Sequence, residues 1–455
     1  MLAILAGTLV AAAVRLPALG SASLASPEQV TLAESQGLST RAPLPAGEAV
    51  LGKSLPRRSG ALEIARGATM PPLYGAGLAL WTRAAGTSET ALRLPSAVAG
   101  VLAVLLVAAL AGRIASPWAP AWAASLVALS PIHALASRSA EPEAPLVLAL
   151  LLALWLAARV ESSGSRAPAV ALGLAIGLLA TSGVAALAAV ALVPLGWLAA
   201  RADRRRAAAL ATATAAAFVV AAALLGVARS PLDFGDIPSW VPDTTVSGIA
   251  RCTGASFTRV AGLEYHLAVS HARYVIPLTA LFVGLMVLGA SRLPARPRSL
   301  LVAGAALPFA LGAALALGMG RVMPLQATRL LAALPFLALL MAAGLASLRG
   351  WSARVAGLVV AGTTAAFLGL ALGRPSYETS PTQAIARDVA RCRGTVVAVQ
   401  RPLDLLALAA WGVPGPFVLR SPGAPPPDGP ALVVGPSATC ASGGASCAPF
   451  PDCGG

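Results

Sequence analysis

Charged residues are scarce in this sequence, and acidic residues are the scarcer kind. Asp, Glu, Lys and Arg make up 11% of the 455 residues and 57% are hydrophobic, whereas soluble domains have about 25% charged residues. A soluble chain of this length needs far more polar surface. The composition and the mean hydropathy of +0.78 therefore argue against a water-soluble globule and predict an integral membrane protein with many spans.

Lysine is almost absent, because Lys53 is the only one in the chain. The 33 basic residues are therefore nearly all arginine, and they outnumber the 18 acids to give a formal net charge of +15. Nucleic-acid binding needs a basic stripe on a soluble face. Here the arginines separate apolar runs, so they indicate membrane topology and no nucleic-acid partner.

Several signatures of catalysis and cofactor binding are missing. The chain has no phosphate-cradling glycine loop, nucleophile elbow or nucleotide fingerprint. Its five cysteines lack metal-site spacing, although four in the C-terminal segment can form disulfides in an oxidising compartment: Cys392, Cys440, Cys447 and Cys453. A group of acids and histidines could hold a divalent metal on paper, but its spacing is irregular: Asp233, Asp236, Asp243, Glu264, His266 and His271. No metal or cofactor is predicted.

Apolar runs recur through the first 373 residues, and we read them as about eleven transmembrane helices. The expected spans are residues 1–14, 91–112, 118–136, 142–158, 168–181, 183–200, 207–228, 273–291, 299–319, 329–348 and 352–373. Two polar segments, residues 16–70 and 230–272, are expected as loops on one side. The predicted fold class is an all-α polytopic membrane protein.

The distribution of arginine predicts the orientation. Alternating the spans from a cytoplasmic N-terminus places most arginines on one side, with almost no acids to offset them. These are Arg113, Arg159, Arg166, Arg201, Arg204, Arg205, Arg206, Arg292, Arg296, Arg298, Arg349 and Arg354. By the positive-inside rule this side is cytoplasmic, and the two polar loops and the C-terminus are extracytoplasmic.

The C-terminal segment, residues 374–455, has a different character from the membrane region, residues 1–373. Residues 382–393 show a helical pattern, and residues 395–399 and 431–434 are short β-branched runs. Proline and glycine clusters separate them. We therefore expect a small α/β extracytoplasmic appendage with a flexible tail.

Four short motifs, in order along the chain, resemble one family. They are Pro71-Pro72-Leu73-Tyr74, Ala91-Leu92-Arg93-Leu94-Pro95-Ser96, Ala128-Leu129-Ser130-Pro131-Ile132-His133 and Arg329-Leu330-Leu331-Ala332-Ala333-Leu334-Pro335. Together they resemble the GT-C superfamily of polyprenyl-phosphate-sugar-dependent glycosyltransferases, including the family 39-like protein O-mannosyltransferases and the aminoarabinose transferases. The resemblance covers roughly residues 1–373.

The resemblance implies an inverting membrane enzyme of the cell envelope, in the bacterial inner membrane. It would move a hexosyl or pentosyl group from a polyprenyl-phosphate sugar to a lipid, protein or glycan acceptor on the extracytoplasmic side. The family's first outer loop carries an acidic pair, and the matching place here reads Pro27-Glu28. Its second acidic motif falls at Glu141-Pro142-Glu143.

Sugar transfer of this kind needs a base for the acceptor hydroxyl and positive charge for the leaving phosphate. A positioned carboxylate supplies roughly 10²- to 10⁴-fold as a general base, and arginine binds phosphate through its planar fork. We expect Glu28 as the base with help from Glu141 or Glu143. Three arginines are expected to receive the lipid phosphate: Arg93, Arg138 and Arg329.

Plainer roles compete with these. Glu28 can be a solvated loop acid, Glu141 and Glu143 can favour a helix N-terminus, and the arginines can snorkel to the interface. Two other functions also stay open. Pro27 replaces one acid of the family's pair, which suggests a catalytically degenerate scaffold. The many spans suit a lipid or solute transporter, although transporters usually carry ionisable groups inside their spans.

Overall fold

The computed structural model describes residues 2–38, 49–60, 70–163, 245–263, 272–373, 396–399, 402–419 and 431–434, with short gaps inside these ranges and a few isolated residues outside them. Contacts divide the chain into two compact units. We call them the helical unit, Met1–Pro17 with Pro95–Arg374, and the mixed unit, Ala18–Leu94 with Pro375–Gly455. The predicted boundary at residue 373 stays a prediction.

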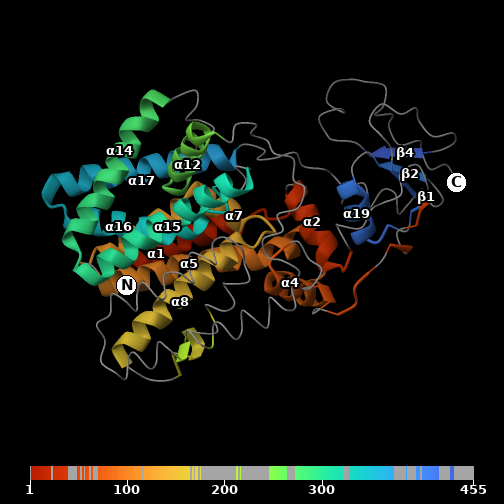
Figure 1. Ribbon diagram of the computed structural model, residues 1–455, viewed down its shortest axis with the longest axis horizontal. Coiled ribbons are helices and arrows are strands. Elements are labelled where there is room, and N and C mark those ends of the chain that lie inside the picture. The colour runs from red at the N-terminus through yellow and green to blue at the C-terminus, as the bar shows by residue number, and fades with distance from the viewer. Residues whose placement is uncertain are drawn as a thin grey trace. The chain divides into compact units, whose positions relative to one another are not determined.

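The helical unit contains most of the long apolar helices (Figure 1). They are α1 (Leu2–Arg15), α5 (Glu89–Ile114, which begins in the mixed unit), α6 (Ala119–Leu129), α7 (Pro131–Ser137), α8 (Glu143–Ser163), α12 (Val246–Val260), α14 (Ala272–Arg292), α15 (Ala295–Met319), the short η3 (Leu331–Ala333), α16 (Leu334–Ser347) and α17 (Gly350–Leu372).

Four helices in the described part of the chain are long and apolar enough to cross a membrane, and the bent pair α6 and α7 makes up to five. The four are Glu89–Ile114, Val275–Arg292, Ala295–Met319 and Gly350–Leu372. The structure therefore agrees with a polytopic membrane protein. The count of about eleven stays a prediction, because the expected spans at residues 168–181, 183–200 and 207–228 lie largely outside the described residues.

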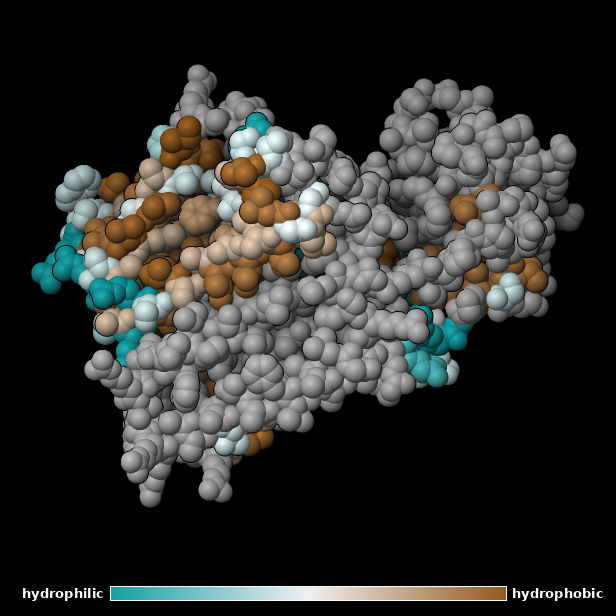
Figure 2. All heavy atoms as spheres, in the orientation of Figure 1, coloured by the Kyte–Doolittle hydropathy of each residue, from teal (hydrophilic) through white to brown (hydrophobic). Residues whose placement is uncertain are grey.

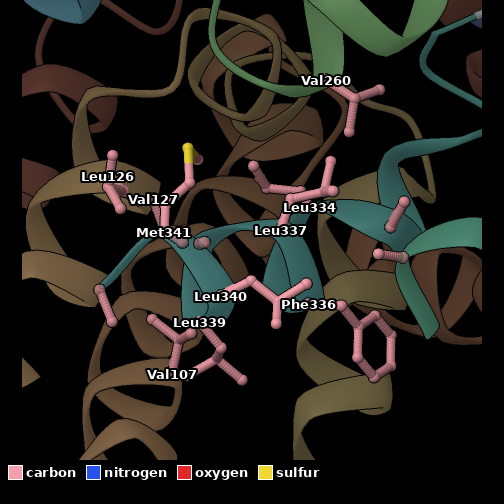
Figure 3. Packing of buried hydrophobic residues seen from close by; sticks show 14 of the residues in the cluster. Val107, Leu126, Val127, Val260, Leu334, Phe336, Leu337, Leu339, Leu340 and Met341 are labelled. Carbon is pink, nitrogen blue, oxygen red and sulfur yellow. The ribbon is translucent and has the colours of Figure 1, made fainter. Parts of the chain in front are cut away.

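Helix α16 forms the centre of the helical unit. Its residues from Leu334 to Leu345 are all buried, and it packs against α14, α6 and α15. Figure 3 shows Phe336, Leu337, Leu340 and Met341 of this helix among side chains of the surrounding helices. Since α16 is apolar on every face, burial on all sides is the arrangement that satisfies it.

Two glycines allow α14 and α16 to approach closely. A Cβ atom on Gly344 would collide with the Leu285 carbonyl oxygen, and one on Gly289 would collide with the Leu340 carbonyl oxygen. Small residues at membrane helix crossings permit this contact between backbones. The glycine-rich composition therefore serves packing at this crossing.

Replacing Gly344 by alanine is expected to lower the thermal stability of the detergent-solubilised protein. The added methyl group must separate two tightly packed backbones, which costs about 1–3 kcal/mol. Gly284 on α14 is the matched control, because a Cβ there meets nothing within 4 Å. An equal melting temperature for Gly344→Ala and Gly284→Ala would contradict this packing.

The outer surface of the helical unit is apolar, as a lipid-facing surface must be. Ile276, Val287 and Leu358 expose 68%, 63% and 74% of their side chains. In Figure 2 hydrophobic residues spread over the region of α14, α15 and α17, and hydrophilic residues gather toward one end. A soluble protein rarely shows such a continuous apolar surface, so these faces suit lipid contact.

Two arginines predicted on the cytoplasmic side lie on one aromatic ring. The guanidinium carbon of Arg113, at the end of α5, is 5.7 Å from the centre of the Trp155 ring, and that of Arg159 on α8 is 4.9 Å from it. Both are cation–π distances. The two helix ends therefore share one end of the helical unit, as the alternation of spans requires.

The mixed unit contains α2 (Ser26–Ser35), α4 (Pro72–Ala85), α19 (Pro402–Ala410) and a four-stranded sheet. The strands are β1 (Ala49–Val50), β2 (Val396–Val399), β3 (Phe417–Leu419) and β4 (Ala431–Val434), in the order β1-β3-β2-β4. Strand β2 pairs in parallel with β3 and β4, and β1 pairs antiparallel with β3.

The mixed unit joins two segments that are far apart in the sequence. Two predicted strands, at residues 395–399 and 431–434, correspond to β2 and β4. Strand β1 comes from the first polar loop, where Ala49 lies opposite Val418, and α2 packs against α19. The predicted helix at residues 382–393 lies almost wholly outside the described residues, as does the C-terminal tail.

Candidate active site

Glu28 and Arg93, two of the residues proposed for the site, bind each other in the mixed unit. Arg93 donates from Nε to Glu28 Oε1 and from Nη2 to Glu28 Oε2, both at 2.7 Å. Arg93 Nη1 also donates to the Leu19 carbonyl at 2.7 Å. Only 3% of Glu28 and 5% of Arg93 is exposed. This is a buried bidentate ion pair.

Glu28 also stabilises the start of its own helix. Its Oε2 accepts a hydrogen bond from the Ala25 backbone N–H at 3.0 Å, at the N-terminus of α2. Such a contact satisfies a backbone donor that the helix leaves free. Three donors on the Glu28 carboxylate and its burial leave little of it open to an acceptor hydroxyl.

Glu141, Glu143 and Arg329 come together in the helical unit. Glu143 is the first residue of α8, its carboxyl group hydrogen-bonds the Glu141 side chain, and Arg329 lies within electrostatic reach. The Oε2 atom of Glu143 is buried and accepts no hydrogen bond from any described residue. A buried carboxylate oxygen without a donor is costly, and a catalytic role is one explanation for such an atom.

Arg138 and Ser96 also make contacts in the helical unit close to Glu141 in the sequence or in space. Arg138 Nη1 donates to the Val14 and Pro17 carbonyls at 2.9 Å each, which caps the end of α1. Ser96, near the start of α5, donates to the Glu141 carbonyl at 2.9 Å. Arg138, which is predicted from the sequence to bind phosphate, therefore binds backbone carbonyls in the structure. The end of α1, the first turns of α5 and the end of α7 meet around residues 138–143.

The structure brings five of the six proposed residues together as two groups. One is the Glu28 and Arg93 pair in the mixed unit, and the other is Glu141, Glu143 and Arg329 in the helical unit. Arg138 also lies in the helical unit, where it binds backbone carbonyls near the end of α1. Among the described residues no group of three or more His, Cys, Asp or Glu side chains could hold a metal ion. The acids and histidines considered for a metal, at residues 233–271, lie outside the described residues.

One buried cluster has no counterpart in the predictions from sequence. Arg15, the last residue of α1, is fully buried and donates to His133 Nδ1, which is also fully buried, at 2.9 Å. The sequence signal was present, since an arginine ends an apolar run and Ser130-Pro131 interrupts another. Only the folded chain brings the two together.

Comparison with known proteins agrees with this architecture. The family model described as dolichyl-phosphate-mannose-protein mannosyltransferase matches residues 69–228. No curated protein sequence matches the chain. Among solved structures, ArnT from Cupriavidus metallidurans in the apo state has a TM-score of 0.58 at 16% identity, over 92% of this chain and 89% of that chain.

Two further structures support the same fold. ArnT from Cupriavidus metallidurans bound to undecaprenyl phosphate has a TM-score of 0.55 at 16% identity, over 91% of this chain and 85% of that chain. The Archaeoglobus fulgidus oligosaccharyltransferase in the apo form has a TM-score of 0.56 at 14% identity, over 92% of this chain and 64% of that chain.

The chain therefore has the fold of these solved GT-C glycosyltransferases, and the resemblance carried by the short motifs is confirmed. The matched mannosyltransferase model covers about a third of the chain, from α4 through α8 and on to residue 228. The shared fold sets the architecture, whereas the activity must be argued from the site.

Proposed function

We propose that this protein is an integral membrane glycosyltransferase that moves a sugar from a polyprenyl phosphate to an acceptor on the extracytoplasmic side. The GT-C fold supports this class of enzyme. One solved structure of this fold, ArnT, is described as bound to undecaprenyl phosphate, which supports a lipid-phosphate donor here. The acceptor is a lipid, a protein or a glycan of the cell envelope.

The observation that carries the proposal is the buried Glu143 oxygen beside Arg329. A carboxylate with one unoccupied oxygen can take a proton, and a nearby guanidinium can bind phosphate oxygens. Burial has the largest influence on this carboxyl group and opposes its ionisation, whereas Arg329 and the hydrogen bond with Glu141 favour it in part. Glu143 is a better candidate base than Glu28, because Arg93 binds the Glu28 carboxylate through two hydrogen bonds and the Ala25 N–H donates a third.

The reaction is a single displacement with inversion at the anomeric carbon. The acceptor hydroxyl oxygen forms the new bond to that carbon while its proton passes to Glu143. The bond from the anomeric carbon to the phosphate oxygen breaks with its electron pair, and the departing polyprenyl phosphate carries the negative charge. Arg329 is positioned to stabilise that charge. Glu141 orients the Glu143 carboxylate through their hydrogen bond.

The proposed orientation follows from the arginines. The helix ends with Arg113 and Arg159 are cytoplasmic, whereas the ends near Arg138, Glu141 and Arg329 are extracytoplasmic. This orientation puts the N-terminus in the cytoplasm and the C-terminus outside it. The membrane we propose is the bacterial inner membrane, which the resemblance implies.

A transfer assay in membranes tests the proposed function. Membranes containing the protein receive radiolabelled polyprenyl-phosphate sugars, with hexosyl and pentosyl donors in separate reactions. The expected result is label in an envelope acceptor and release of polyprenyl phosphate. Binding of the donor without product would instead indicate a degenerate scaffold, for which Pro27 is the motivating residue. Movement of a solute into vesicles without transfer would indicate a transporter.

Replacing Arg329 by methionine is expected to raise the KM for the polyprenyl-phosphate donor by roughly ten- to a hundredfold. The methionine keeps an unbranched side chain but loses a charge-assisted contact to phosphate worth about 1.5–3 kcal/mol. Arg354→Met, at the end of the protein assigned to the cytoplasm, is the control. An unchanged donor KM in Arg329→Met would show that Arg329 does not bind the donor.

A further inference from the structure

We infer that Arg15 is a positioning residue that holds a break in a membrane span and so fixes the segment carrying Glu141 and Glu143. The structural part of this inference stands on contacts within the helical unit. Its consequence for sugar transfer rests on the proposed function. The three features that support it are the break itself, the donors of Arg15 and the course of the chain after α7.

The break lies between α6 and α7, which meet at an angle of 63°. Helix α6 ends at Leu129, and Ser130 has a non-helical conformation with φ −59° and ψ 117°. The next residue, Pro131, has no backbone N–H and cannot donate to the carbonyl of Val127, four residues earlier. Inside a membrane, a carbonyl left without a donor is costly.

Arg15 supplies donors to the carbonyls at this break. Its Nη2 donates to the Val127 carbonyl and its Nη1 to the Ala128 carbonyl, each at 3.0 Å. The side chain thus replaces the helical hydrogen bond that Pro131 cannot make. Its Nη1 also reaches the Ala11 carbonyl at 3.4 Å, which ties the guanidinium to its own helix α1.

The same guanidinium binds the helix on the other side of the break. Nη2 donates to His133 Nδ1 at 2.9 Å, and Nε donates to Ser137 Oγ at 3.3 Å. Gly100 of α5 faces this contact, because a Cβ there would collide with the Ser137 side chain. One planar group therefore connects the end of α6 with both turns of α7.

All these partners of Arg15 are neutral, so the contact is one of hydrogen-bond geometry. Lysine has three donors on a single atom, whereas arginine has five in a fixed fork. A lysine at position 15 would keep the positive charge but could not reach carbonyls of α6 and polar side chains of α7 together. The break between α6 and α7 therefore depends on the geometry of the guanidinium donors more than on their charge.

The chain after α7 leads directly to the proposed site. Ser137 is followed by Arg138, which binds the Val14 and Pro17 carbonyls on either side of Arg15 in the sequence. Residues 139–143 then reach Glu141 and Glu143. The segment is therefore attached to the end of α1 twice, once through Arg15 and once through Arg138. Loss of the Arg15 contacts frees α7 and shifts the candidate base.

The test compares Arg15→Met and Arg15→Lys, each with and without Pro131→Ala. Hydrogen exchange of backbone amides in residues 127–137 is followed by mass spectrometry in nanodiscs. Arg15→Met is expected to speed this exchange by roughly ten- to a hundredfold, because buried carbonyls lose their donors. Pro131→Ala supplies an N–H and allows Ser130 to become helical, so that residue 131 can donate to the Val127 carbonyl. It is therefore expected to reverse most of that increase in the double variant with Arg15→Met.

Three results would overturn the inference. The first is an unchanged rate of amide exchange in residues 127–137 of Arg15→Met, and the second is an unchanged rate in Arg15→Lys. The third is a double variant whose change in exchange rate is the sum of the changes in Arg15→Met and Pro131→Ala. Arg113→Met, an exposed arginine at the other end of the helical unit, is the control and should leave this exchange unchanged. If Arg15→Met does not fold, Arg15→Lys with and without Pro131→Ala gives the same comparison.

The transfer assay separates this inference from the proposed function. In Arg15→Lys, kcat is expected to fall by about tenfold with an unchanged donor KM, because the base is displaced while the phosphate contact remains. An unchanged kcat beside faster exchange would overturn the positioning role alone. Absence of transfer in the wild-type protein would reject the proposed function, and hydrogen exchange would still decide the role of Arg15.

Discussion

Replacing Glu143 by glutamine is expected to lower sugar transfer by about 10²- to 10⁴-fold while the protein inserts and folds normally. Glutamine has nearly the same shape as glutamate but cannot accept the acceptor's proton. Its effect should fall on kcat, because the donor phosphate is bound elsewhere. Transfer in membranes and melting temperature in detergent measure the two quantities separately.

The controls distinguish a base from a residue that only stabilises a helix. Glu143 begins α8, where a negative charge is favourable, so loss of charge alone costs about 0.3–1 kcal/mol. Glu63→Gln removes an exposed acid that caps a turn in the mixed unit and should leave transfer unchanged. If Glu143→Gln retained wild-type kcat, Glu143 would be a structural residue of α8.

Breaking the buried pair of Glu28 and Arg93 is expected to have the largest effect on stability. Glu28→Gln removes the carboxylate charge that the buried Arg93 guanidinium binds and leaves the weaker influence of Glu89, which costs about 3–5 kcal/mol. Arg93→Met should cost a similar amount, because the buried Glu28 carboxylate then loses both hydrogen bonds from the guanidinium. The double variant removes both charges and should be more stable than the sum of the single effects predicts. Chemical unfolding of the purified variants measures this coupling.

The same variants decide between two roles for Glu28. If the residue is structural, transfer per folded molecule should be largely restored in the double variant with Arg93→Met. A Glu28→Gln protein of wild-type stability that lacks all transfer would show instead that Glu28 is the base. That result would assign the Glu143 carboxylate a supporting role.

The candidate residues were accessible to sequence reasoning, but their pairing was not. The resemblance to the family's two acidic motifs singles out Glu28, Glu141 and Glu143 among the few carboxylates of the chain. The bond between Glu28 and Arg93 joins residues 65 positions apart. Hydrophobic periodicity carries no information about such contacts, since it reports only which face of one element is apolar.

The strands likewise divide into those that the sequence predicts and those that form only in the folded chain. β-Branched runs predict β2 and β4, because such residues favour extended backbone. Strand β1 has two residues, and its partner strand β3 begins at Phe417. A segment this short has no periodicity of its own and becomes a strand only when a neighbour supplies hydrogen bonds.

Composition and the order of apolar runs by themselves determine that this chain belongs in a membrane, that its helices are amply hydrophobic and that arginine marks one side. These properties follow from the transfer of side chains out of water, which is a local quantity. Only the tertiary structure decides which polar groups satisfy one another inside. Arg15 at a helical break, Glu28 on Arg93 and a Glu143 oxygen with no donor among the described residues are outcomes of packing distant segments, where each buried donor must find an acceptor.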